Sequence, residues 1–401
     1  MRIVVLSPYV PFPANRGGLA DVWRRMQAMS VLGHDVMLVA PVDGGKERPE
    51  ARFVDAIERV TKAQFYFPII RSWRLTVIRL LRSFWVPWHA ATRIPAARSL
   101  VGLQNCVREF QPDVLWLEGP WLGVVGKQLS KRLGVPLLYR SHNVEASYML
   151  GQAKLAMCLR TRLTLRLSCI GLRRFEIRAI RRAVSIFDIS MDDLEYWKGQ
   201  GIRNLHWLPP LPEIVFRKQS TDPIRGDLVF VGNLSMPNNV RGVEWLLTEV
   251  LPRVRAQLPN VRCRIVGSNP SPHIRQLLTS TADVELCADV PDTVPYLFGA
   301  RVLLNPVLSG SGVQVKMLDM LMTDAPIVTA SQGTRGFPAE VRTLFRVADD
   351  ADAFAQAVCE ELRTSSVDIV ARARARDLFS VAAVSRALEV AQQAKGNDGV
   401  I

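Results

Sequence analysis

The chain has 401 residues, of which 48% are hydrophobic and 22% are charged. This composition excludes a largely disordered protein, and the length favours two domains. The formal net charge is +14, so an anionic partner is expected. No apolar run is long enough for a transmembrane helix, and the N-terminal run is too short for a signal peptide.

The six cysteines and five histidines show no metal-ligand spacing. No Ser-His-Asp arrangement stands out either. The sequence therefore predicts reduced thiols in a cytoplasmic protein, with no metal site and no cofactor.

The first half of the chain alternates predicted strands and helices. A strand over residues 3–6 precedes a loop rich in proline and glycine, and apolar residues on one face predict a helix over residues 19–32. Further strands are predicted over residues 35–40, 113–117, 137–140 and 184–189. This alternation is typical of βαβ units and a parallel sheet.

A proline-rich linker over residues 208–212 precedes a second half with the same pattern. A helix is predicted over residues 243–258, and strands over residues 227–232, 261–266, 284–286, 302–304 and 326–329. The predicted fold class is α/β, with two Rossmann-like parallel-sheet domains facing across a cleft. The expected divisions are an N-terminal domain (1–207), a C-terminal domain (208–380) and a C-terminal helix or tail (381–401).

The strongest motif is a glycine loop that leads into a predicted helix, over residues 306–321. Gly310 and Gly312 let backbone amides approach an anion such as a diphosphate at the helix N-terminus. Lys316 adds a positive charge one turn into the helix, and Asp319 follows on the same face, where a carboxylate can bind ribose hydroxyls. A flexible loop before a structural helix is the alternative interpretation.

The segment 306–321 resembles the donor-binding signature of family 4 glycosyltransferases, which have the GT-B fold and transfer a sugar with retention. Residues 11–18 resemble the family's N-terminal glycine loop. Residues 141–145, at the end of a predicted strand, and residues 230–239, which open the second domain, are also similar. The resemblance spans roughly residues 1–337.

The resemblance implies a role for particular residues. Gly17 and Gly18 would bring amides to the donor phosphates or the acceptor, and His142 would hydrogen-bond the transferred sugar as the catalytic residue. Asp319, which stands where the family usually has Glu, would bind ribose, and the backbone around Val290 would meet the nucleobase. The residues expected to hold the diphosphate are Gly310, Ser311, Gly312 and Lys316.

The chain also departs from the family's pattern. Ser311 stands where many members have a Glu near the sugar. Asn233 and Asn239 lie near positions where many members have Arg and Lys, and Arg241 is the nearest cation. Arg241 would either bind the donor phosphate or be a solvated arginine at a helix start. Glu118 also follows a predicted strand, and it would either touch the acceptor or be a surface carboxylate.

The implied function is transfer of a sugar from a UDP- or GDP-linked donor to a glycan or lipid-linked acceptor, in polysaccharide biosynthesis. The loop amides, Lys316 and Arg241 would stabilise the leaving diphosphate without a metal. The alternatives are a catalytically silent GT-B protein that binds nucleotide sugars, and a GT-B epimerase or phosphorylase-like enzyme.

The positive charge is confined to the first half. Residues 1–205 hold 31 Lys and Arg against 16 Asp and Glu, a balance of +15, which leaves −1 for the rest. Two stretches, between Glu58 and Glu109 and between Glu145 and Glu176, contain no acidic residue. The first carries arginines among tryptophans: Arg71, Arg74, Arg79 and Arg82 with Trp73, Trp85 and Trp88. This pattern favours a protein at the inner face of an anionic membrane over a solvated surface, and no nucleic-acid motif accompanies it.

Overall fold

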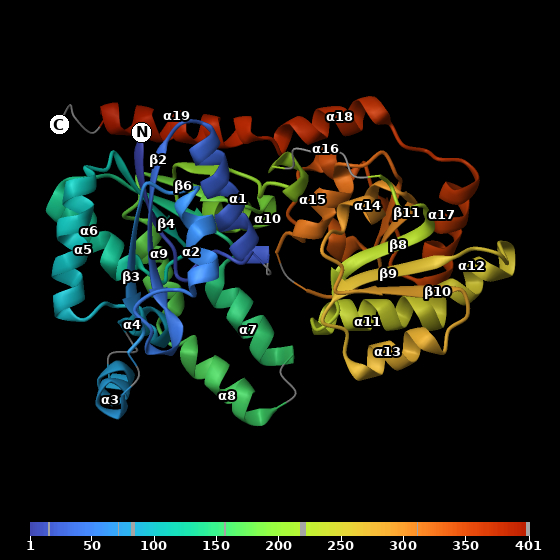
Figure 1. Ribbon diagram of the computed structural model, residues 1–401, viewed down its shortest axis with the longest axis horizontal. Helices are drawn as coiled ribbons and strands as arrows, with labels where there is room; N and C mark the ends of the chain where they lie inside the picture. Colours follow the sequence, from blue (N-terminus) through green and yellow to red (C-terminus); the bar gives the residue numbers. More distant parts are fainter. Residues whose placement is uncertain are drawn as a thin grey trace. The chain divides into compact units, whose positions relative to one another are not determined.

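The computed structural model describes residues 1–14, 17–70, 72–81, 85–155, 158–216, 222–310 and 312–397. It divides the chain into two compact units (Figure 1). Unit 1 comprises Met1–Pro210 together with Val381–Ile401, and unit 2 comprises Leu211–Ser380.

Unit 1 is built on a parallel sheet, whose described strands number seven, in the order β3-β2-β1-β4-β5-β6-β7. The strands are β1 (Arg2–Leu6), β2 (Asp35–Val42), β3 (Ala63–Pro68), β4 (Val114–Glu118), β5 (Leu137–Ser141), β6 (Ser185–Asp188) and β7 (Leu205–Trp207). The central strands are buried along almost their whole length, as expected for a sheet covered by helices on both faces.

The helices of unit 1 follow these strands in the chain. They are α1 (Gly17–Val31), α2 (Ala51–Glu58), α3 (Trp73–Leu81), α4 (Trp88–Thr92), α5 (Ala97–Phe110), α6 (Gly123–Leu133), α7 (Glu145–Leu155), α8 (Leu159–Ser168), α9 (Leu172–Ile180), α10 (Met191–Gly199) and α19 (Val381–Asn397). A short 3₁₀ turn, η1 (Asp43–Gly45), follows β2.

The last helix, α19, belongs to unit 1, whereas the sequence set residues 381–401 apart as a helix or tail. It packs against α1 and β6 and buries Val384, Leu388 and Ala391. Burial of this apolar stripe is the reason that the chain returns to its first unit.

Unit 2 contains the second parallel sheet, with six described strands in the order β10-β9-β8-β11-β12-β13. The strands are β8 (Gly226–Asn233), β9 (Cys263–Ser268), β10 (Val284–Ala288), β11 (Ala300–Asn305), β12 (Ile327–Thr329) and β13 (Arg346–Val347). The α-helices are α11 (Pro237–Trp245), α12 (Leu251–Gln257), α13 (Pro272–Thr279), α14 (Val294–Phe298), α15 (Val315–Leu321), α16 (Ala339–Arg342), α17 (Ala351–Arg363) and α18 (Ile369–Leu378). The short turns are η2 (Glu213–Phe216), η3 (Leu246–Val250, a π-helical turn) and η4 (Ser331–Thr334).

The helical segment predicted over residues 243–258 begins earlier, at Pro237. Proline has no backbone N–H, and backbone N–H groups in the first turn of a helix have no partner within the helix. Proline therefore favours a helix start. The π-helical turn η3 then joins α11 to α12. The earlier start brings Asn239 and Arg241 into a helix, which decides where their side chains lie.

In each sheet the strand order reverses at one point, between β1 and β4 in unit 1 and between β8 and β11 in unit 2. Ligands of doubly wound sheets bind outside the carboxyl ends of the strands at such a switch point. The loops after these four strands are therefore where each unit should hold its ligand.

Gly267, at the end of β9, provides a test of how tightly unit 2 is packed. A Cβ there would lie 2.3 Å from the carbonyl oxygen of Gly232 and 2.6 Å from Cγ of Leu234. We expect Gly267→Ala to lower the free energy of unfolding by about 1–3 kcal/mol, because overpacking forces paired backbone apart. Gly199→Ala is the control, because open space surrounds Gly199. Urea unfolding followed by circular dichroism measures both, and an unchanged midpoint for Gly267→Ala would contradict the close approach.

Candidate active site

The glycine loop of unit 2 lies at the carboxyl end of β11. Gly312 has a φ of 73° and Gly310 a φ of 153°, regions that a residue with a side chain rarely adopts. Helix α11 packs directly on the loop's start, since a Cβ on Gly242 would lie 2.9 Å from the carbonyl oxygen of Pro306. Ser311, expected at the diphosphate, lies outside the described residues. The loop is thus held against α11 with backbone that only glycine adopts freely.

Lys316, in the first turn of α15, has neutral surroundings. Its Nζ donates to Oδ1 of Asn239 at 3.1 Å and lies 4.4 Å from the centre of the Phe230 ring. Nδ2 of Asn239 in turn donates to the carbonyl oxygen of Asn233 at 2.9 Å. Burial lowers the pKa of Lys316 to about 7. Among the described residues no carboxylate pairs with this ammonium, so its environment suits an anionic ligand.

A set of amide side chains surrounds the loop, which the sequence analysis did not identify. Nδ2 of Asn305 donates to Oε1 of Gln314 and to Oγ1 of Thr329, both at 3.1 Å. Nε2 of Gln332 is buried without a partner in the described parts of the chain, and it would lie 4.0 Å from a Cβ on Gly310. A buried donor that the protein leaves unpaired is a candidate ligand contact. Gln332 follows the end of β12, so the strand-end rule was the signal that could have found it.

Three further residues of unit 2 were predicted to contact the donor, namely Asp319, Arg241 and Val290. Oδ1 of Asp319 accepts the backbone N–H of Glu213 at 2.7 Å, so ribose would share this carboxylate with the start of η2. Arg241 is exposed on α11, and its Nε donates to the carbonyl oxygen of Pro237 at 3.3 Å. Val290 is half-buried in the loop after β10, at the same edge of the sheet as the glycine loop.

His142, the predicted catalytic residue, follows β5 in unit 1 and lies between two carboxylates. Its Nε2 is 2.8 Å from Oε2 of Glu118, and its Nδ1 is 3.3 Å from Oδ2 of Asp21. The His142 side chain is 14% exposed, whereas both carboxylates are almost fully buried. Both ring nitrogens of His142 thus already lie near a carboxylate oxygen. A sugar that hydrogen-bonds His142 must therefore displace one of these carboxylates or share a ring nitrogen with it.

Two arginines balance those carboxylates. Arg25 bonds Oδ2 of Asp21 at 2.8 Å and Oε1 of Glu118 at 2.6 Å, and Arg140 bonds Asp21 at 3.1 Å. Burial opposes ionisation of Asp21, but Arg140 and Arg25 outweigh it and hold the pKa of that carboxyl below its usual range. Burial likewise opposes ionisation of Glu118, yet Arg25 and His142 lower its pKa. Glu118 is thus buried, and its interpretation as a surface carboxylate is wrong.

Asp21, Glu118 and His142 bring their ligand atoms within 4.8 Å of one another, which is close enough to hold a metal ion. The guanidinium groups of Arg25 and Arg140 already supply two positive charges to the two carboxylates. The arrangement is therefore a neutralised ion cluster, and a cation would compete with both arginines.

Gly17 and Gly18 form the exposed first turn of α1, the helix that also carries Asp21 and Arg25. A Cβ on Gly18 would meet nothing within 4 Å, so packing within the protein does not require glycine there. Open backbone amides at the start of a fifteen-residue helix suit the approach of an anion.

The architecture resembles solved glycosyltransferase structures over the whole chain. HepE of Anabaena in complex with UDP matches with a TM-score of 0.64 at 15% identity, covering 98% of this chain and 100% of HepE. Sucrose-phosphate synthase of Thermosynechococcus elongatus matches with a TM-score of 0.61 at 15% identity, covering 100% of both chains.

The sequence agrees with two family models. The glycosyl transferase 4-like domain matches residues 17–210, and the glycosyl transferases group 1 model matches residues 225–364. The chain is a GT-B glycosyltransferase resembling family 4. The family resemblance and the α/β fold expected from the sequence are thereby confirmed.

One curated relative of this glycosyltransferase matches over most of both chains. It is 25% identical over 351 residues, which cover 84% of each chain, and is described as an uncharacterized 44.6 kDa protein in the cps region of Klebsiella pneumoniae. This relative matches across both units of the glycosyltransferase, although no activity has been assigned to it.

Replacing Lys316 provides a test of the donor site in this glycosyltransferase. We expect Lys316→Ala to reduce turnover by about 100- to 1000-fold, because one lost electrostatic contact to developing charge typically has that effect. Since burial lowers the pKa of Lys316 to about 7, a diphosphate that pairs with its ammonium would bind with proton uptake above that pH, and the affinity for UDP as a probe should fall from pH 7 to about pH 9. Calorimetric titrations in this range should show no such fall for Lys316→Ala. Lys131→Ala, at an exposed lysine of α6, is the matched control, and equal activity of wild type and Lys316→Ala would contradict the assignment.

Proposed function

We propose that this glycosyltransferase takes its sugar from a nucleoside diphosphate sugar, UDP- or GDP-linked, bound at the carboxyl edge of the unit 2 sheet. The ammonium of Lys316 is the observation that carries the proposal, because it lies beside the glycine loop without a described ion-pair partner. The solved complexes of HepE with UDP and with UDP-glucose support a uridine donor by analogy of fold.

The proposed chemistry is metal-independent transfer with retention. As the bond from the sugar carbon to the diphosphate breaks, negative charge grows on the phosphate oxygens. Lys316, the amides of Gly310 and Gly312 and the unpaired amide of Gln332 would stabilise that charge. The acceptor hydroxyl then attacks from the leaving-group face and gives its proton to the departing phosphate. In this scheme His142 positions the sugar hydroxyls, and Asp319 binds the ribose.

For the acceptor we propose a glycan or a lipid-linked sugar, held by unit 1, in the synthesis of a polysaccharide. The relative in a cps region supports that pathway. The epimerase alternative differs in its products, since an epimerase returns a nucleotide sugar and needs no acceptor.

Two helices of unit 1 suggest how the enzyme would reach a lipid-linked acceptor. Within the described ranges, no helix combines the length and apolarity needed to cross a bilayer. Helix α8 nevertheless exposes Leu159, Leu163 and Leu167, one per turn, with Arg160 and Arg166 also exposed on the same helix. Figure 1 shows α8 and the amphipathic α3 at the same end of unit 1. We infer that this end binds the inner face of an anionic membrane peripherally.

Of the aromatic and basic residues that first suggested a membrane surface, Trp73 and Trp85 are exposed, whereas Trp88 and Arg79 line a pocket of unit 1. Arg71 and Arg82 lie outside the described residues, as does the side chain of Arg74. The leucines of α8 were missed, because the sequence analysis weighed the charges of that stretch and not its apolar spacing.

Nucleotide binding and donor hydrolysis test the proposed donor. We expect UDP or GDP to raise the melting temperature more than ADP or TDP, since a ligand of the native state stabilises it in proportion to its affinity. Slow release of UDP or GDP from the matching sugar donor should accompany binding, and an added acceptor should accelerate it. A protein that binds nucleotide without any donor turnover would refute transferase chemistry, and conversion to an epimeric nucleotide sugar would show the alternative reaction.

Leu163 provides a test of the membrane proposal. Leu159→Glu combined with Leu163→Glu should strongly reduce binding to vesicles of phosphatidylglycerol and phosphatidylcholine, because charge replaces apolar contact on α8. Ile369→Glu with Val370→Glu is the matched control on unit 2, where the same kind of exposed apolar pair occurs. Co-sedimentation measures all three proteins. Equal, negligible pelleting of wild type with anionic and neutral vesicles, or no effect of the α8 change, would show that this surface does not bind membranes.

A further inference from the structure

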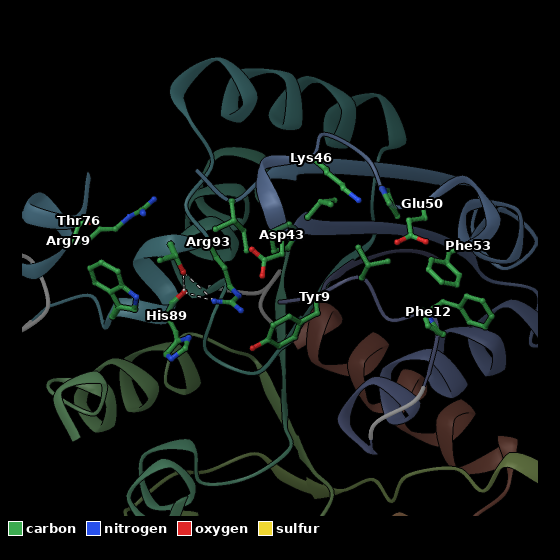
Figure 2. A pocket seen from close by; sticks show the side chains of 18 residues that line it. Tyr9, Phe12, Asp43, Lys46, Glu50, Phe53, Thr76, Arg79, His89 and Arg93 are labelled. Carbon is green, nitrogen blue, oxygen red and sulfur yellow. Dashed lines mark hydrogen bonds between the residues drawn. The ribbon is translucent and has the colours of Figure 1, made fainter. Parts of the chain in front are cut away.

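A pocket of about 630 Å³ opens at the carboxyl ends of β1, β2 and β3 in unit 1 (Figure 2). It lies at the same edge of the sheet as His142, which follows β5. Its apolar and aromatic lining consists of Tyr9, Val10, Phe12, Pro13, Pro41, Val42, Pro49, Phe53, Ile69 and Trp88. A mostly apolar concave site with a few polar groups is typical of a small-molecule site.

The pocket is elongated, and its two ends differ in chemistry. Figure 2 shows Thr76 and Arg79 at one end, Phe12 and Phe53 at the other, and Tyr9 between them. The carboxylate of Glu50, at the Phe12 end, already pairs with Arg52 at 2.8 Å. Asp43, Lys46 and Arg93 also line the pocket, and Arg79 lies at the end away from Glu50.

Arg79 is the polar group that most clearly calls for a ligand. The residue is only 9% exposed, and its NH1 donates to the carbonyl oxygen of Ile70 at 2.9 Å. No other hydrogen bond and no ion pair to Arg79 is present in the described part of the chain. Burial lowers the pKa of its guanidinium. A guanidinium with unused donors in a pocket is suited to bind a phosphate, which accepts two of its N–H groups at once.

The helix that carries Arg79 has an opposite, apolar side. Thr76 and Arg79 of α3 line the pocket, whereas Trp73, Val77, Ile78 and Leu81 are exposed and are not among the residues that line it, with Trp73 exposed by 74%. Exposed apolar side chains on one arc of a short helix indicate an apolar surface that covers them. The charge balance of +15 over residues 1–205 makes an anionic bilayer the matching surface.

We propose that this pocket is the acceptor site and takes a sugar joined to a lipid chain through a phosphate. The phosphate binds Arg79, the sugar lies among the aromatic rings toward Phe12 and Phe53, and the chain leaves along α3 into the bilayer. This inference rests on the proposed transferase function, and it adds the chemical class of the acceptor and the residues that recognise it. Arg79, grouped by the sequence with the surface arginines, is thereby assigned to the pocket.

Isothermal titration with decyl phosphate, below the concentration at which it forms micelles, tests the pocket. We expect saturable binding of one molecule, weakened at least about tenfold by Arg79→Gln, as for loss of a hydrogen bond between charged groups. Inorganic phosphate and decyl glucoside, which each supply part of the ligand, should bind at least about tenfold more weakly than decyl phosphate. Arg98→Gln, at an exposed arginine of α5, is the matched control and should leave affinity unchanged.

Arg79→Gln also removes the hydrogen bond from Arg79 to Ile70 and could disturb α3, so a second variant serves as a check. Thr76→Phe obstructs the Arg79 end of the pocket without removing the Arg79 guanidinium, and it should also weaken decyl phosphate binding at least about tenfold. If both variants bind decyl phosphate as the wild type does, the pocket is not its site. If inorganic phosphate binds as tightly as decyl phosphate, the ligand is a soluble anion and the lipid assignment is wrong.

UDP binding, measured on the same samples, separates this proposal from the proposed function. Unchanged UDP affinity in both variants shows that unit 2 is intact, so that loss of decyl phosphate binding reports on the pocket. Wild-type protein that binds UDP but not decyl phosphate overturns the acceptor proposal alone. Protein that binds decyl phosphate but no nucleotide overturns the donor assignment, and with it the pocket's role in glycosyl transfer.

Discussion

The buried ion cluster of Arg25, Asp21, Glu118 and Arg140 is the constraint on which unit 1 depends. It joins α1 to the ends of β4 and β5, and NH1 of Arg140 also bonds the carbonyl oxygen of Leu208 near the end of the unit. Removing one member would leave a buried charge unpaired, which typically costs about 3–5 kcal/mol. The same contacts fix His142, so the geometry of the predicted catalytic residue and the stability of the sheet edge have one origin.

The glycine-loop site of unit 2 has a buried charge without an ion-pair partner among the described residues. Its glycine loop is bordered by neutral amides, and the one ammonium beside them, Lys316, is balanced by a carbonyl oxygen and an aromatic ring. A buried cation in neutral surroundings raises the free energy of the empty protein, and an anionic ligand such as the proposed diphosphate would relieve that cost. The contrast between these two sites is thus physical: the cluster beside His142 balances its carboxylates with arginines, whereas no described carboxylate pairs with Lys316.

Two helices of unit 1, α3 and α8, expose apolar residues at the surface. They lie at the same end of the unit (Figure 1). Because Arg79 projects from the inner side of α3, one short helix links an apolar outer surface to a basic pocket. An acceptor with a lipid chain and a phosphate matches both sides of that helix.

The sequence by itself determined the α/β alternation, the two parallel sheets and the positions of the glycine loop, because buried strands and glycine turns are local patterns. It missed β3, β7 and β13, which are edge strands of the two sheets; β7 and β13 are two or three residues long, and β3 is mostly half-buried. It could not decide that Glu118 pairs with Arg25, or that Arg79 turns into a pocket. Those contacts join residues far apart in the chain, and only the packing of helices on the sheet brings them together. The sequence names the charged residues, but the tertiary structure decides which charges are cancelled and which are left for a ligand.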